Sequence, residues 1–231
     1  MSFSRAISFI NFINKKQYLK ENGDEKIDHV GLCHNRDYSW AWNSLAEMED
    51  AICVAVTNNA QLLNASFTNQ LVSASTNRTS SAMRCEAHML LSICAYQRYL
   101  GTQEALYLAD ESRCASNAVV TAGSDRTSWQ YWMARLVFAG SFASRSDYGE
   151  VCSLMQNSLV QYASSGYTNE MSQVEKAILT RFEMDGLDLP GAMRVMAGMS
   201  AASLGNKDAA RQYANQVPDK YKRIMLEFIN D

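Results

Sequence analysis

The stretch LPGAMRVMAGMSAASLGNKDAARQYANQVP, which begins at Leu189 and ends at Pro218, predicts the fold of this chain. Within it, two apolar helical patterns meet at Leu204, Gly205 and Asn206. Glycine stops the first helix, because it alone takes the left-handed conformation without steric cost, and the asparagine can cap the second. We therefore expect a pair of short antiparallel helices.

The first of these helices is apolar on two sides. Pro190 is tolerated in its first turn, where the missing N–H group has no helical partner in any case. Two stripes of small and apolar residues then repeat at helical spacing. One contains Met193, Met196, Ala197, Ser200 and Leu204, and the other contains Ala192, Val195, Met199 and Ala202. Such a helix is buried between neighbours, and the short helix after it also depends on packing.

The composition favours an all-α fold. The chain has 231 residues, of which 47% are hydrophobic, enough for one large or two small domains with a sizeable core. Only 2 prolines and 11 glycines occur, which disfavours an all-β protein with many tight turns. The net charge of -3 gives no electrostatic reason to expect nucleic acid as a partner. No run of about 18 apolar residues predicts a membrane span.

Six cysteines are scattered along the sequence, and most lie in apolar helical patterns: Cys33, Cys53, Cys85, Cys94, Cys114 and Cys152. In a chain of this size, that arrangement indicates reduced thiols that fill a core. A reducing compartment is then expected, and we predict a cytoplasmic protein.

Two regions are expected. Residues 1–36 are predicted to form an N-terminal amphipathic helix and a polar linker, since Phe3, Ile7 and Ile10 fall at helical spacing. This helix either packs on the body of the protein or docks on a membrane surface or a partner. Residues 37–231 are predicted to form a single all-α domain of about ten helices joined by short connections.

Three stretches share one design, in which an Ala-rich helix, a tight stop and a capped second helix follow one another. They are residues 81–119, 128–162 and 189–217. In the first stretch, Gly101 is expected to end one helix and Thr102 to cap the next. Together the three form a weak internal repeat.

These helix pairs resemble tetratricopeptide repeats. The last pair carries the clearest match, in residues Gly198, Leu204, Gly205, Ala210 and Pro218. The resemblance covers residues 81–231 and implies antiparallel helix pairs stacked as a superhelix. The helix stops are not spaced by the family's period of about 34 residues. An irregular α-helical bundle is therefore the alternative.

What the resemblance implies for function is a concave groove that binds a peptide or a partner helix, lined by the first helix of each pair. Matched onto this chain, the lining residues are His88, Leu91, Arg98, Trp132, Arg135, Val195 and Met199. Arg98 and Arg135 are the expected clamps for a carboxylate or a backbone carbonyl. The expected function is a non-enzymatic protein–protein interaction module that acts as an adaptor, chaperone or regulator.

Two other functions stay open: a structural protein that assembles with copies of itself as a homo-oligomer, and an α-helical enzyme whose site residues are scattered in the sequence. Zinc-ligand residue types occur at His29, Cys33, His34, Cys85 and His88. Cys85, however, lies in a pattern typical of a core. Since the sequence contains no phosphate loop, nucleophile elbow or metalloprotease motif, we expect no catalytic residue, cofactor or metal.

Overall fold

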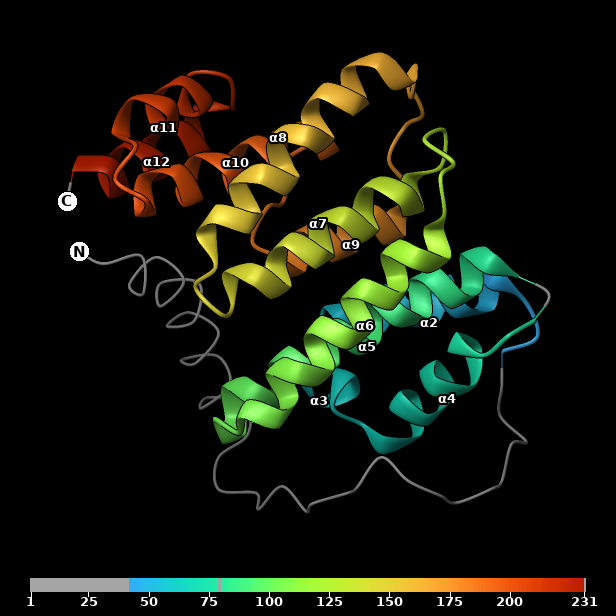
Figure 1. Ribbon diagram of the computed structural model, residues 1–231. Helices are drawn as coiled ribbons and strands as arrows, with labels where there is room; N and C mark the ends of the chain where they lie inside the picture. Colours follow the sequence, from blue (N-terminus) through green and yellow to red (C-terminus); the bar gives the residue numbers. More distant parts are fainter. Residues whose placement is uncertain (1–41, 79, 231) are drawn as a thin grey trace.

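The computed structural model describes residues 42–78 and 80–230, and over these residues it consists of helices without a strand (Figure 1). The helices are α2 (Leu45–Val56), α3 (Asn59–Leu62), α4 (Ala65–Ser75), α5 (Ser81–Thr102), α6 (Ala105–Ala122), α7 (Trp129–Ala143), α8 (Tyr148–Ser165), α9 (Gln173–Arg181), α10 (Leu189–Ser203), α11 (Lys207–Ala214) and α12 (Asp219–Asn230). The predicted all-α fold class is thereby confirmed. The helix and linker expected in residues 1–36 lie outside the described residues.

Residues 189–218 form α10 and α11, as their pattern predicts. Asp188 caps α10 by accepting a hydrogen bond of 2.8 Å from the backbone N–H of Gly191. Asn206 caps α11 through its own side-chain oxygen in a bond of 3.1 Å. Between them, Gly205 has φ 78°, the left-handed conformation that ends a helix. Hydrogen bonds and backbone conformations within a few residues therefore determine where α10 and α11 begin and where the chain turns between them.

The first pair ends differently from the sequence-based expectation. Helix α5 runs past Gly101 and ends at Thr102, so neither residue has its predicted role. Gln103 takes the left-handed conformation instead, with φ 61°, and its backbone N–H donates to the Tyr99 carbonyl at 2.7 Å. Helix α5 contacts α2, α4, α6 and α7, and this packing outweighs the intrinsic cost of about 1 kcal/mol for one glycine in a helix.

The helices from α5 onward contact one another in a repeating order. Helices α5 and α6 form an antiparallel pair, and α7 packs on both of them; α7 and α8 form the next pair, and α10 packs on both of those. Helices α10 and α11 form a third pair, which α12 covers in the same way (Figure 1). Each pair is thus covered by one later helix, which packs against both helices of the pair.

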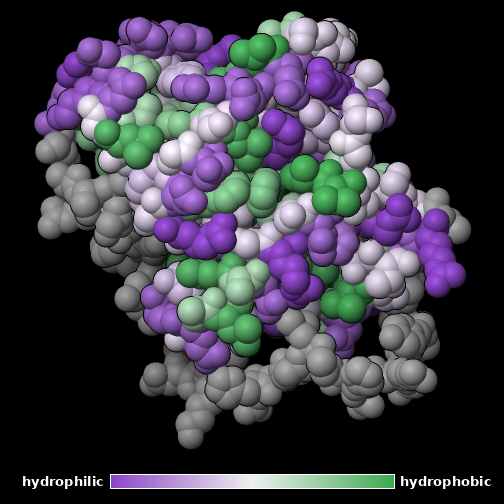
Figure 2. Space-filling view, viewed as in Figure 1, coloured by the Kyte–Doolittle hydropathy of each residue, from purple (hydrophilic) through white to green (hydrophobic). Residues whose placement is uncertain are grey.

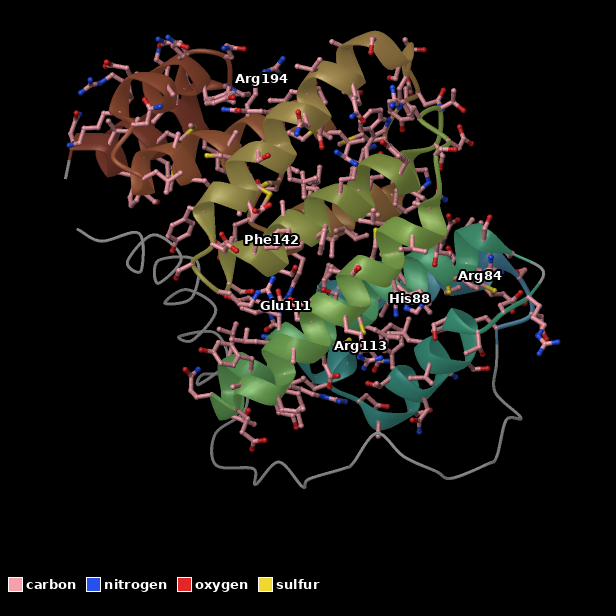
Figure 3. The ribbon with its side chains drawn as sticks, in the orientation of Figure 1. Arg84, His88, Glu111, Arg113, Phe142 and Arg194 are labelled. Atoms are coloured by element: carbon pink, nitrogen blue, oxygen red, sulfur yellow. The ribbon has the colours of Figure 1, made fainter. Side chains whose placement is uncertain are left out.

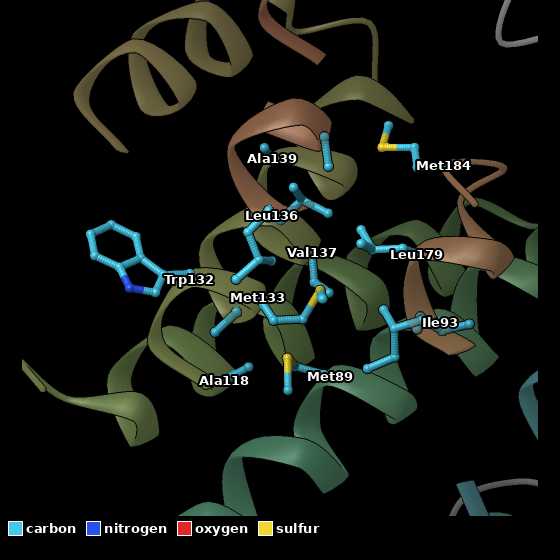
Figure 4. Packing of buried hydrophobic residues seen from close by; sticks show 14 of the residues in the cluster. Met89, Ile93, Ala118, Trp132, Met133, Leu136, Val137, Ala139, Leu179 and Met184 are labelled. Atoms are coloured by element: carbon cyan, nitrogen blue, oxygen red, sulfur yellow. The ribbon is translucent and has the colours of Figure 1, made fainter. Parts of the chain in front are cut away.

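Helix α9 departs from this order. It follows α8 in the sequence but packs against α2, which in turn contacts α5 (Figure 1). Just after α9, the Phe182 ring lies 3.5 Å from the place where a Cβ atom on Gly140 of α7 would stand. Figure 4 shows Leu179 of α9 beside Val137 of α7 and Ile93 of α5, and all belong to one buried cluster. Helices α2 and α9 therefore cover one side of α5 and α7.

Helix α10 approaches α11 and α12 closely at Gly198. A Cβ atom placed there would stand 2.2 Å from Cε of Met225 and 2.9 Å from Cβ of Tyr213. The methionine end can move aside, but the Tyr213 Cβ is fixed to the backbone of α11. The absence of a side chain at Gly198 therefore permits the short distance between the helices.

We expect Gly198→Ala to lower the free energy of unfolding by about 1–3 kcal/mol, because the added methyl group forces α11 away from α10. The matched control is Gly149→Ala on α8, where nothing lies within 4 Å of the added atom. That change should stabilise the helix by about 0.5–1 kcal/mol. Urea denaturation of both variants measures the difference, and a Gly198→Ala variant as stable as the wild type would contradict the close approach.

Candidate functional site

Trp132, predicted to line a groove, lies wholly inside the protein. Its side chain is 0% exposed, and its indole N–H donates to the Arg126 carbonyl oxygen at 3.0 Å. The ring meets those of Tyr131 and Tyr162 edge-on, with centroids 4.7 Å and 5.1 Å away. Such contacts join α7 to α8 as core, so Trp132 offers no surface to a partner. Its place in the predicted lining is corrected accordingly.

Arg98 and Arg135, the two predicted clamps, point toward different helices. Arg98 donates from Nη2 to Oγ1 of Thr68 on α4 at 3.2 Å. Arg135 donates from Nε to Oγ of Ser158 on α8 at 2.8 Å, and its guanidinium lies 5.5 Å from the centre of the Tyr131 ring. Helices α4 and α8 stand at opposite ends of the view in Figure 1. The structure does not bring the two guanidinium groups into one groove.

The other predicted lining residues are half-buried. Leu91, Val195 and Met199 pack against the main core cluster. His88 lies near Arg84 and Arg113 (Figure 3), and its Nδ1 atom is buried with no hydrogen-bond partner in the described part of the chain. Burial, followed by the charges of the two arginines, lowers the pKa of His88 below its ordinary value. These four residues belong to packed helix faces and do not form a clamp.

The thiol groups in the described residues are unreactive in this fold. Five free cysteines occur there, at Cys53, Cys85, Cys94, Cys114 and Cys152. Burial raises the pKa of Cys85 and of Cys94 to about 12, and that of Cys114 to about 11. A nucleophilic or metal-binding cysteine needs a thiolate, which these surroundings disfavour. The buried thiols are core atoms, as predicted.

Two of the three buried glutamates in the described residues hold their protons at neutral pH. Burial raises the pKa of Glu86 and of Glu111 to about 8. Oε1 of Glu86 accepts from Nε2 of Gln130 at 2.9 Å, while its Oε2 has no partner among the described residues. Oε2 of Glu111 accepts from the Ser144 hydroxyl at 2.7 Å. Neither carboxyl lines the groove described next, so both act within the packing of the helices.

An open groove lies between α8, α10 and α11. Its volume is about 460 Å³, within the usual range of about 300–1,000 Å³ for small binding sites. The side chains that line it include Gln156, Leu159, Val160 and Tyr162 of α8, Arg194 of α10 and Tyr213 of α11. We call this hollow the α8–α11 groove. It exists because α8 and α11 both pack on α10.

Apolar and cationic groups meet in the α8–α11 groove. Val160 stands 73% exposed on α8. Figure 2 shows the hydrophobic side chains on the visible face as separate small patches between polar ones. Figure 3 places Arg194 between α8 and α11, and this half-buried residue makes no hydrogen bond or ion pair with any residue that the structure describes. The groove therefore combines apolar contact area with one unpaired positive charge.

One residue in the sequence could have indicated this groove, although the predicted lining did not include it. Arg194 is the only charged residue in α10, a helix of otherwise small and apolar side chains. The two predicted apolar stripes assigned this helix to the core. A lone arginine in such a helix indicates a place where the helix reaches solvent or a partner.

The described residues contain neither a cluster of metal ligands nor a helix that could cross a membrane. No group of three or more His, Cys, Asp or Glu side chains could hold a metal ion among them, and His29, Cys33 and His34 lie outside them. None of the helices described is both long enough and apolar enough to cross a membrane. Comparison with known proteins adds no relative: no protein-family model, curated protein or solved structure matches the chain significantly.

Glu86 predicts a pH-dependent stability. Its pKa is 4.5 ordinarily and about 8 in the fold, so the folded protein holds more protons than the unfolded chain between these values. Stability is therefore highest below this window and falls as pH rises through it, by about 1.4 kcal/mol per pH unit for one carboxyl. Glu86→Gln removes this carboxyl and should reduce the slope, while Glu111, whose pKa is also about 8, keeps its own contribution.

Urea denaturation at a series of pH values from about 5 to 8 measures this slope. The control is Glu170→Gln, since Glu170 is exposed in the loop before α9 and should leave the wild-type slope unchanged. If wild type and Glu86→Gln show the same slope, Glu86 is ionised in the folded protein and its raised pKa is wrong.

Proposed function

We propose that the protein is a non-enzymatic protein–protein interaction module, built as a tetratricopeptide-like stack of helix pairs that binds a peptide. The order of contacts supports the stack, because each of the three pairs packs on the first helix of the next, or on α12 after the last pair. The α8–α11 groove supports the binding role, since it is open, partly apolar and carries an unpaired guanidinium. That groove is the single observation on which the proposal rests.

The binding surface in this proposal differs from the inner groove that the resemblance implies. Helices α2 and α9 cover the side of α5 and α7 on which Leu136, Val137 and Ile93 lie. A peptide would have to displace both helices to reach those side chains. The α8–α11 groove needs no such displacement, because its lining is already open to solvent.

We also propose that the protein works in a reducing compartment, with the cytoplasm as the location. The support comes from Cys85 and Cys94, which are buried as free thiols in the core. Their sulfur atoms donate to backbone carbonyl oxygens, at 3.4 Å to Ala118 and 3.2 Å to Leu62. An adaptor, chaperone or regulator in such a compartment fits this picture.

The proposed function is tested by selecting random dodecapeptides on the immobilised protein and measuring the Kd of the enriched peptides by fluorescence anisotropy. Val160→Asp places a charge in the groove and should weaken binding about tenfold or more. The matched control is Val120→Asp on α6, because Val120 is 76% exposed and lies outside the groove.

Two results would contradict the proposal. One is a selection that enriches no peptide. The other is a set of peptides that Val120→Asp weakens as much as Val160→Asp does. Circular dichroism of both variants checks that they fold, and sedimentation of the wild type tests homo-oligomer formation as the competing function.

A further inference from the structure

Apart from Arg194, the half-buried arginines in the described residues, Arg181 among them, each interact with another part of the protein. Arg84 donates to the Asn77 carbonyl at 2.6 Å, while Arg98 and Arg135 donate to hydroxyl groups. Arg194 is half-buried as well, yet it has no such acceptor among the described residues. An arginine that lies in a groove without a protein acceptor leaves its five N–H donors available to a ligand. Its presence in an open groove indicates a role in binding an anion.

The surroundings of Arg194 supply no anion of their own. None of the described side chains that line the α8–α11 groove is acidic. The nearest acidic residue in the sequence, Asp188, already accepts from Gly191 as the cap of α10. Around the guanidinium stand the apolar surfaces of Leu159, Val160 and Tyr213. A ligand that fits must therefore bring a negative charge together with apolar surface.

We propose that the α8–α11 groove binds an internal peptide segment in which an Asp or Glu residue lies next to a large apolar residue. The carboxylate accepts two parallel hydrogen bonds from the Arg194 guanidinium, a geometry that arginine favours. The apolar side chain packs on Val160 and Leu159. This inference rests on the proposed function and names the class of peptide that it binds.

A side-chain carboxylate fits better than a peptide C-terminus. Terminal carboxylates are typically captured by several free backbone N–H groups. The first turn of α10, which borders the groove at Pro190, has few to offer. Pro190 has no N–H, Gly191 donates to the Asp188 side chain, and Ala192 donates to the Asp188 carbonyl at 2.9 Å. Of the remaining groove residues, Gln216 lies just after α11 and its N–H donates to the Tyr213 carbonyl at 2.9 Å, while the others lie inside helices, where the N–H groups are already bonded.

Charge also argues against residues 1–16 of the chain as the occupant. Residues 1–16 contain Arg5, Lys15 and Lys16 and no acidic residue. Placing this segment beside Arg194 brings like charges together in a partly buried site, which is unfavourable. A separate acidic peptide neutralises the guanidinium instead.

The test uses the full chain and three pools of dodecapeptides. The first pool has blocked termini and one Glu beside Leu or Phe. The second has blocked termini with Gln in place of Glu, and the third has Gln and a free C-terminal carboxylate. Each peptide that binds is measured by fluorescence anisotropy against wild type, Arg194→Gln, Arg194→Lys and the control Arg223→Gln, which changes an exposed arginine of α12.

We expect binders from the Glu pool alone. Replacing their Glu by Gln should weaken binding to the wild type about tenfold. In the Arg194→Gln protein, replacing the peptide's Glu by Gln should change the affinity by less than about twofold, because the guanidinium that bound the carboxylate is absent. Arg194→Lys should bind more tightly than Arg194→Gln but less tightly than the wild type. Lysine keeps the positive charge but cannot donate two parallel hydrogen bonds to one carboxylate. Arg223→Gln should behave as the wild type.

Other outcomes overturn this inference while leaving the proposed function standing: binders that come from the Gln pools, or a Glu-to-Gln loss that is equal in wild type and Arg194→Gln. A dimer of the wild type that Val160→Asp dissociates would identify a second copy as the occupant and also overturn it. A chain that binds none of the three pools and enriches no random peptide overturns the proposed function itself. The Tm of Arg194→Gln should equal or exceed that of the wild type, because no native contact is lost.

Discussion

The short helices in the described part of this protein depend on packing against their neighbours, because such helices are marginal by themselves in water. Helix α11 has only 8 residues and is held between α10 and α12. Helix α10 contacts α7, α8, α11 and α12, and the missing side chain at Gly198 lets two of them approach. A stack in which each pair is covered by the next helix satisfies this requirement throughout the chain from α5 to α12.

The sequence predicted the features that depend on neighbouring residues. Gly205 and Asn206 define the boundary between α10 and α11 through contacts within a few positions, so their roles could be read directly. The direction of a side chain on a buried helix depends on distant segments. Arg98 and Arg135 bond to α4 and α8, and nothing in their spacing distinguishes these partners from a shared groove. The return of α9 to α2 is equally non-local, and it decides which surface stays open.

The polar groups of this protein fall into two kinds. Those inside the fold are neutral or hydrogen-bonded: Glu86 keeps its proton and accepts from Gln130, and Glu111 accepts from Ser144. Such pairing is what burial demands, since an unpaired buried charge is costly. Arg194 follows neither rule, because guanidinium stays ionised at any ordinary pH and has no acceptor among the described residues. That contrast, more than the size of the groove, is the reason for proposing a binding role there.

The place of α9 explains why the α8–α11 groove lies open on the outer side of the helix pairs. A helix-pair stack presents an inner side, formed by the first helices, and grooves between successive second helices. Here Leu179 and Phe182, in and just after α9, pack on the inner side of α5 and α7, so apolar surface there stabilises the fold. Between α8 and α11 no such segment intervenes, because the chain has already passed through α9 before it reaches α10. The detour that completes the core therefore leaves Val160 and Arg194 open, and binding at that groove requires no part of the core to unfold.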